Sequence, residues 1–171
     1  ILAELKATKI PERAGRALDH ETEDAIVATA KEFGMRILGP NIIGVISNSD
    51  KMNASFAPFL PFAGKASLVS QSGALLIALD AASYSRGVGF DKMVSIGNMS
   101  DIDFADLIAY LSEDDNTSCI TFYIEGLKNG RRFMEEALKC DKPIVALKSG
   151  VSAHGAAAAA TTSCCGAASF G

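Results

Sequence analysis

Four small or polar residues, Ser70-Gln71-Ser72-Gly73, separate an apolar run from a helical pattern. The run 66–69 is typical of a buried strand, and apolar residues recur at helical spacing after Gly73. A helix that begins at such a turn has backbone N–H groups without intrahelical partners, and its dipole adds partial positive charge there. This arrangement binds phosphate or carboxylate groups. An ordinary serine N-cap explains the same residues, so the turn alone does not decide between the two interpretations.

Glu125 follows a second apolar run, 120–124, which is rich in β-branched and aromatic residues. A carboxylate at the end of a buried strand is partly desolvated unless it is paired. Such a group accepts a hydrogen bond from a histidine or acts as a general base. The alternative is a solvated acid at the end of a strand.

Two asparagines also follow predicted strands. Asn41 comes after a Gly-Pro pair, and Asn98 follows Gly97. Either side chain could hydrogen-bond a ligand carbonyl, but asparagine is also a common turn residue.

Other residues whose side chains could bind a metal or take part in a reaction have simpler explanations. Asp101, Asp103 and Asp106 could ligate a metal, yet acids at the start of a helix interact favourably with its dipole, and we predict no metal site. His20 and His154 are the only histidines in the sequence, and neither has a recognisable ligand spacing.

Strands alternate with helices from residue 66 to residue 147, which predicts an α/β fold with a mostly parallel, doubly wound sheet. Ligands bind such sheets beyond the carboxyl ends of the strands. Four small or polar turns occupy that edge: 39–41, 70–73, 97–100 and 125–126. The predicted helices cover about 22–33, 74–86, 101–111 and 129–139, and the predicted strands 35–38, 42–46, 53–56, 66–69, 92–96, 119–124 and 144–147.

The composition narrows the class of protein. The chain of 171 residues has a formal net charge of −4, and it contains no cluster of Lys and Arg of the kind that binds nucleic acid. No apolar run approaches the roughly 18 residues of a membrane span. Cys119, Cys140, Cys164 and Cys165 match no zinc spacing and are expected to be reduced thiols of a cytoplasmic protein.

Several of these turns together resemble one family, the nucleoside-diphosphate-forming acyl-CoA synthetases. This family includes ADP-forming acetyl-CoA synthetase and the α subunit of succinyl-CoA synthetase. The resemblance implies that residues 1–40 are the end of a Rossmann-type CoA-binding domain, most of which is absent. It implies that residues 41–171 are a flavodoxin-like domain ending in a phosphohistidine loop. The motifs, in order, are Gly39-Pro40-Asn41, Asn53-Ala54-Ser55-Phe56, Ser70-Gln71-Ser72-Gly73-Ala74-Leu75, Ser95-Ile96-Gly97-Asn98, Tyr123-Ile124-Glu125-Gly126 and Lys148-Ser149-Gly150.

The resemblance also implies a reaction, in which acyl-CoA, ADP and phosphate interconvert with an acid, CoA and ATP. The reaction passes through an acyl phosphate and a phosphohistidine. CoA and ADP or ATP with Mg²⁺ would be bound mainly by parts outside this chain. The implied partners are an ATP-grasp domain or β subunit, the CoA-binding domain and a small carboxylic acid, within an oligomer.

In the same resemblance, Ser70, Gln71, Ser72 and Gly73 bind the phosphoryl group, and Glu125 orients the catalytic histidine. Asn41 and Asn98 line the acyl-phosphate and thioester end of the site.

The sequence departs from this pattern at the phosphorylated histidine, because the matching position is Thr162. Threonine cannot replace imidazole as a phosphoryl carrier at ordinary rates, so the chain alone is expected to be inactive. The alternative is a histidine-less regulatory domain of the kind attached to some protein lysine acetyltransferases.

Overall fold

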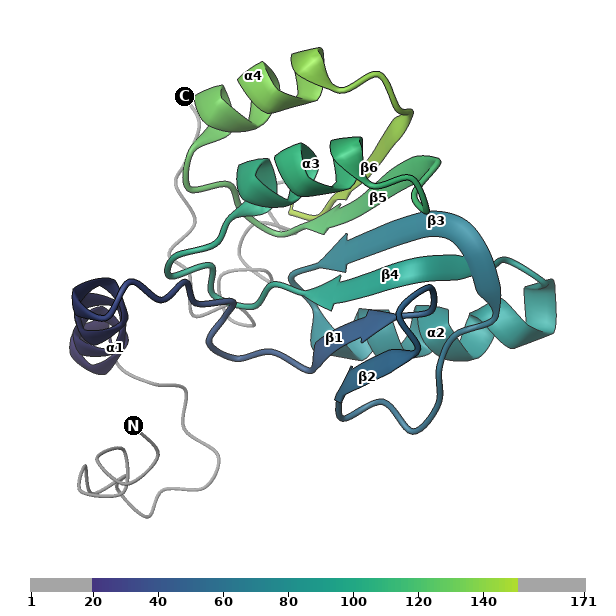
Figure 1. Cartoon of the computed structure of the whole chain (residues 1–171), viewed down its shortest axis with the longest axis horizontal. Helices are drawn as coiled ribbons and strands as arrows, with labels where there is room; N and C mark the ends of the chain where they lie inside the picture. Colours follow the sequence, from purple (N-terminus) through teal and green to yellow (C-terminus); the bar gives the residue numbers. More distant parts are fainter. Residues whose placement is uncertain (1–19, 151–171) are drawn as a thin grey trace.

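The computed structural model describes residues 20–150, which form one six-stranded sheet and four helices. The strand order is β2-β1-β4-β3-β5-β6 (Figure 1). The strands are β1 (Gly44–Ser47), β2 (Met52–Ser55), β3 (Ala63–Ser70), β4 (Phe90–Ser95), β5 (Cys119–Ile124) and β6 (Ile144–Lys148), and the helices are α1 (His20–Glu32), α2 (Gly73–Arg86), α3 (Phe104–Glu113) and α4 (Gly130–Lys139).

The sheet is doubly wound, as the alternation of strands and helices predicts. Strands β3, β4, β5 and β6 are parallel, with α3 and α4 on one face and α2 on the other (Figure 1). Adjacent strand residues therefore belong to different cores: Leu68 and Met93 pack with Leu76 of α2, whereas Val69 and Val94 pack in the core that contains α3. In that second core, the rings of Phe104 and Phe122 meet edge to face at 5.4 Å between centroids.

Local sequence signals set the ends of the helices. Ser72 caps α2 by accepting the N–H of Leu75, and Gly87 ends the helix in the left-handed region at φ 63°. Asp103 and Asp106 form a reciprocal capping box at the start of α3. None of the helices between residues 20 and 150 is long and apolar enough to cross a membrane.

One expectation about the strands needs correction. The predicted strand 35–38 has no regular secondary structure and pairs with no strand in the described residues. Its backbone is held instead by the turn after β4, because the N–H of Ile37 donates to Asp101 Oδ2 at 2.7 Å and Ile102 N–H donates to the Ile37 carbonyl at 3.0 Å. The sheet is mostly parallel, as predicted, and its antiparallel part is β1, which runs antiparallel to both β2 and β4. The short connection from Ser47 to Met52 closes β1 and β2 into a hairpin.

Candidate functional site

A pocket of about 270 Å³ lies where β3, β4 and β5 end. It brings together six of the predicted site residues from four turns and the start of α2, and Ser70 is the nearby predicted residue that does not line it. Its lining residues are Asn41, Ile42, Ile43, Gln71, Ser72, Gly73, Ala74, Gly97, Asn98 and Glu125. The four turns that are far apart in the sequence thus share one cavity, at the sheet edge where ligands bind in this class of fold.

The turn after β3 contains both the cap and the free amides that the sequence left as alternatives. Ser72 Oγ accepts the N–H of Leu75 at 3.3 Å, and the Ser72 carbonyl accepts the N–H of Leu76 at 3.1 Å. Ser70 is fully buried, and its hydroxyl donates to the Ser72 carbonyl at 2.8 Å and accepts the Ser72 N–H at 3.1 Å. The N–H groups of Gly73 and Ala74 have no intrahelical acceptor and lie at the pocket wall. Serine capping and anion binding are therefore compatible here.

Gln71 connects the turn after β3 to the turn after β5. Its Oε1 accepts the backbone N–H groups of Glu125 at 2.6 Å and Gly126 at 2.9 Å, and its own N–H donates to the Tyr123 carbonyl at 3.2 Å. Its side-chain oxygen is thus used to fix the position of Glu125. The sequence contains no local signal for this contact, because the partners are 54 and 55 residues apart.

Glu125 is half-buried at the pocket wall. Burial raises the pKa of its carboxyl group, and the charge of Lys148 opposes that shift. Lys148 Nζ itself donates to the backbone carbonyl of Glu125 at 2.8 Å. Within residues 20–150, no donor hydrogen-bonds the Glu125 carboxylate, so it can accept a proton or an N–H group from a ligand or from another segment.

The two asparagines of the pocket contact each other, and a buried acid holds one of them. Asn41 Nδ2 donates to Asn98 Oδ1 at 3.3 Å. Asn98 Nδ2 in turn donates to Glu23 Oε1, and Ser100 Oγ donates to Glu23 Oε2 at 2.9 Å. The sequence indicated only that Glu23 is an acid in the first turn of a helix, so this contact was not predicted.

The turn after β4 approaches residues 39–41 so closely that position 97 requires glycine. Asn98 N–H donates to the Pro40 carbonyl at 3.0 Å, and Ser100 N–H donates to the Gly39 carbonyl at 2.9 Å. A Cβ atom on Gly97 would lie 2.1 Å from the Pro40 carbonyl oxygen, and Gly97 has φ 55°. The pocket geometry at Asn41 and Asn98 therefore depends on the absence of a side chain at Gly97.

We expect Gly97→Ala to lower the free energy of unfolding by more than about 2 kcal/mol, because it adds a backbone clash to the strain of a positive φ. Gly87→Ala is the matched control: Gly87 has φ 63°, but a Cβ there would meet nothing within 4 Å. That variant should lose only about 1 kcal/mol. Urea unfolding of both variants measures the difference, and equal losses would contradict the close approach at Gly97.

The acids that follow β4 are engaged in ion pairs. Asp101 pairs with Arg36 at 2.9 Å, and Asp106 pairs with Arg132 at 2.7 Å. The hydrogen bond from Arg132 holds the pKa of Asp106 well below its usual range. Residues 20–150 contain no group of three His, Cys, Asp or Glu side chains that could hold a metal ion.

Comparisons with known proteins agree with this fold. The family model described as succinyl-CoA ligase like flavodoxin domain matches residues 63–169. The chain is 48% identical over 143 residues to the α subunit of acetate–CoA ligase [ADP-forming] I of Pyrococcus furiosus, covering 82% of this chain and 31% of that protein. It is 36% identical over 143 residues to 4-hydroxybutyrate–CoA ligase [ADP-forming] of Nitrosopumilus maritimus, covering 80% of this chain and 20% of the relative.

A solved structure is also similar. It is the dinucleotide forming acetyl-coenzyme A synthetase 1 of Ca. Korarchaeum cryptofilum in complex with phosphate and ADP, with a TM-score of 0.83 and 38% identity. The match covers 88% of this chain and 33% of that one. The chain thus spans about a third or less of the length of these relatives.

The fold is a doubly wound α/β domain with a pocket at the carboxyl ends of its parallel strands. The family match covers more than half of the sequence. The chain belongs to the family of succinyl-CoA ligase like flavodoxin domains.

Proposed function

We propose that this chain is the flavodoxin-like part of an ADP-forming acyl-CoA ligase. The whole enzyme would interconvert acyl-CoA, ADP and phosphate with a carboxylic acid, CoA and ATP, through an acyl phosphate and a phosphohistidine. Support comes from the family match and from relatives whose names state that they are ADP-forming ligases. In this proposal residues 1–40 end a CoA-binding domain and residues 41–171 form the flavodoxin-like domain.

The observation that carries the proposal is the pocket at the start of α2. The N–H groups of Gly73 and Ala74, which have no intrahelical acceptor, and the helix dipole suit a phosphoryl group, which would lie among residues of the Ser70–Gly73 turn. A similar protein was solved in complex with phosphate and ADP, which is consistent with an anion site in this family.

The other pocket residues receive distinct roles. Glu125 would orient the phosphohistidine, since its carboxylate has no donor within the described residues and its pKa is raised by burial. Asn41 and Asn98 would contact the acyl-phosphate and thioester end of the substrate. The position expected for the nucleophile, Thr162, lies outside the described residues.

The remaining parts of the reaction belong to other segments or subunits. CoA, ADP or ATP and Mg²⁺ would bind mainly to an ATP-grasp domain or β subunit and to the CoA-binding domain. The relatives include α subunits, and a name of that kind implies a further subunit in those proteins. We propose the same division for this protein, as a cytoplasmic oligomer that acts on a small carboxylic acid.

One observation favours a second function. Thr162 stands where the family has its histidine, and a threonine there would leave a domain that binds acyl-CoA-derived ligands without carrying phosphate. Such a domain would be a regulatory module, for example attached to a protein lysine acetyltransferase. Transfer of phosphate to a restored histidine distinguishes the two functions.

The anion site is tested by Ala74→Glu. Ala74 is exposed in the first turn of α2 and lines the pocket, so a carboxylate there favours the helix dipole but repels a bound anion. We expect the affinity for inorganic phosphate, measured by calorimetry on the intact protein, to fall at least about tenfold, or 1.4 kcal/mol.

Two controls separate charge from size and position. Ala74→Gln adds a neutral side chain of the same length, and Ala78→Glu places the same charge one turn further along the exposed side of α2. Both should retain most of the phosphate affinity. Equal binding by the unchanged protein and Ala74→Glu would contradict an anion site at this turn.

A further inference from the structure

Glu23 is a buried acid for which the proposed reaction has no role. It lies in the first turn of α1, a helix that stands apart from the sheet in Figure 1, yet Glu23 is only 7% exposed. Its two carboxylate oxygens accept hydrogen bonds from the side chains of Asn98 and Ser100, in the turn that forms one wall of the pocket. A helix-dipole interaction needs neither burial nor these partners.

The chemistry of the carboxylate fixes the orientation of two amides. An ionised carboxylate only accepts hydrogen bonds, so Asn98 must turn its NH₂ group toward Glu23. Asn98 Oδ1 then faces Asn41, which must present its own NH₂ group, as the 3.3 Å contact shows. Within residues 20–150 the Asn41 Oδ1 atom makes no hydrogen bond, so this acceptor is available to a ligand in the pocket that Asn41 lines. A single acceptor in α1 therefore sets the polarity of the Asn98–Asn41 pair.

We propose that Glu23 is a positioning residue that fixes the amide polarity of the Asn98–Asn41 pair and so sets how the pocket receives the acyl end of an acyl phosphate. The pair lies on the β4 side of the pocket, whereas the free amides of Gly73 and Ala74 lie on the β3 side. This inference rests on the proposed function, because it assigns the acyl end of that substrate to the Asn98–Asn41 pair.

The test compares two ligands in the intact protein, inorganic phosphate and acetyl phosphate. Glu23→Gln keeps the volume of the side chain, but glutamine can donate as well as accept, so it removes the constraint on Asn98. We expect the preference for acetyl phosphate over phosphate, as a ratio of Kd values, to fall about three- to tenfold, the size of one hydrogen bond. The Kd for phosphate alone should not change.

Glu21→Gln is the matched control, because Glu21 is an exposed acid in the same first turn of α1. It should leave the Kd ratio unchanged. Glu23→Asp keeps a carboxylate, which only accepts hydrogen bonds, so it should retain most of the Kd ratio whatever its effect on stability. An unchanged ratio in Glu23→Gln would overturn the inference and reduce Glu23 to an anchor for α1.

A second measurement does not depend on ligand binding. The side-chain amide resonance of Asn98 in a ¹⁵N-resolved NMR spectrum should shift in Glu23→Gln and remain in place in Glu21→Gln. If the unchanged protein binds neither ligand, the proposed function fails. The NMR result then still decides on Glu23, since an Asn98 resonance that does not respond to Glu23→Gln would overturn the fixed polarity.

Discussion

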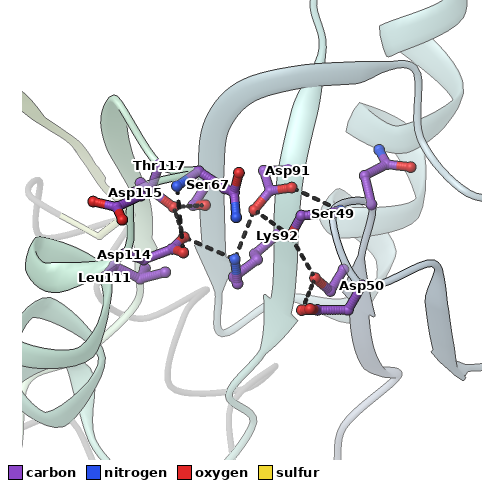
Figure 2. Close-up of polar contacts among 12 residues, drawn as sticks. Ser49, Asp50, Ser67, Asp91, Lys92, Leu111, Asp114, Asp115 and Thr117 are labelled. Carbon is purple, nitrogen blue, oxygen red and sulfur yellow. Dashed lines mark hydrogen bonds and ion pairs between the residues drawn. The ribbon is translucent and has the colours of Figure 1, made fainter.

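We expect Lys92→Met to lower the free energy of unfolding by about 3–5 kcal/mol, because it leaves two carboxylates without their cation. Lys92 Nζ lies 2.6 Å from Asp91 Oδ2 and 2.7 Å from Asp114 Oδ2 (Figure 2). The side chains of Lys92 and Asp91 are only 6% and 4% exposed. The ion pairs connect the start of β4 to the end of α3, at the edge of the sheet opposite the pocket.

Lys92, Asp91 and Asp114 form a buried ionic cluster, and the polar groups around it explain why these charges tolerate burial. The N–H of Ser49 donates to Asp91 Oδ1 at 2.9 Å, and the Thr117 hydroxyl donates to Asp114 (Figure 2). Burial opposes the charged forms, but hydrogen bonds with the partners raise the pKa of Lys92 and lower the pKa of Asp114. The contribution of the cluster is therefore present at neutral pH. It is lost at low pH as Asp114 becomes protonated, and at high pH above the ordinary pKa of lysine.

Chemical denaturation at several pH values measures this prediction. Lys65→Met is the matched control, since Lys65 is an exposed lysine on the neighbouring strand β3 whose Nζ donates to the Asp115 carbonyl at 3.4 Å. It should change the free energy of unfolding by less than about 0.5 kcal/mol. Adding Asp114→Asn to Lys92→Met should recover part of the loss. A loss no greater than that of Lys65→Met would show that the buried ion pairs do not stabilise the domain.

Much of the fold follows from local patterns. Strand β5 has the predicted limits, 119–124, because it alternates buried with half-buried residues and is bounded by polar turns. The end of α1 is also local, since Gly34 adopts φ 64° and the N–H of Met35 donates to the Ala30 carbonyl at 2.8 Å.

The features that local patterns did not predict concern partners that are distant in the sequence. Residues 35–38 have the apolar pattern of a buried strand, but their backbone is satisfied by a carboxylate 64 residues away rather than by a strand. The direction of β1 likewise depends on its pairing with β4, which the composition of a four-residue strand does not encode.

The site shows the same division. The turns themselves could be predicted from the sequence because small residues follow apolar runs. The parallel topology then brings these turns to one pocket. The residues that hold those turns in place could not be predicted from the sequence. Glu23 contacts Asn98 across 75 residues, and the helix dipole already accounts for an acid at position 23. Long-range hydrogen bonds to a pocket turn leave no periodic signal in the sequence.

The largest expected effect on activity concerns Glu125 and position 162. In the intact protein, Thr162→His should create an imidazole that accepts a phosphoryl group from acetyl phosphate: a nitrogen–phosphorus bond forms and acetate leaves. In that background we expect Glu125→Gln to slow the transfer by about 10²- to 10⁴-fold. A carboxylate that accepts one ring N–H raises the nucleophilicity of the other ring nitrogen, whereas a neutral amide does so weakly.

Incorporation of ³²P into an acid-labile, base-stable form measures the transfer, and the pH dependence of its rate gives a second test. In the proposed role, Glu125 would accept the ring N–H only when it is ionised, and burial raises its pKa. The rate should therefore rise with pH through a value above that of an ordinary glutamate. Glu113→Gln, which changes an exposed acid at the end of α3, should leave both rate and profile unchanged. Labelling of the unchanged protein would contradict the role of position 162. A folded Thr162→His protein that stays unlabelled would favour the regulatory domain, because a domain that only binds its ligand keeps the pocket but transfers no phosphate.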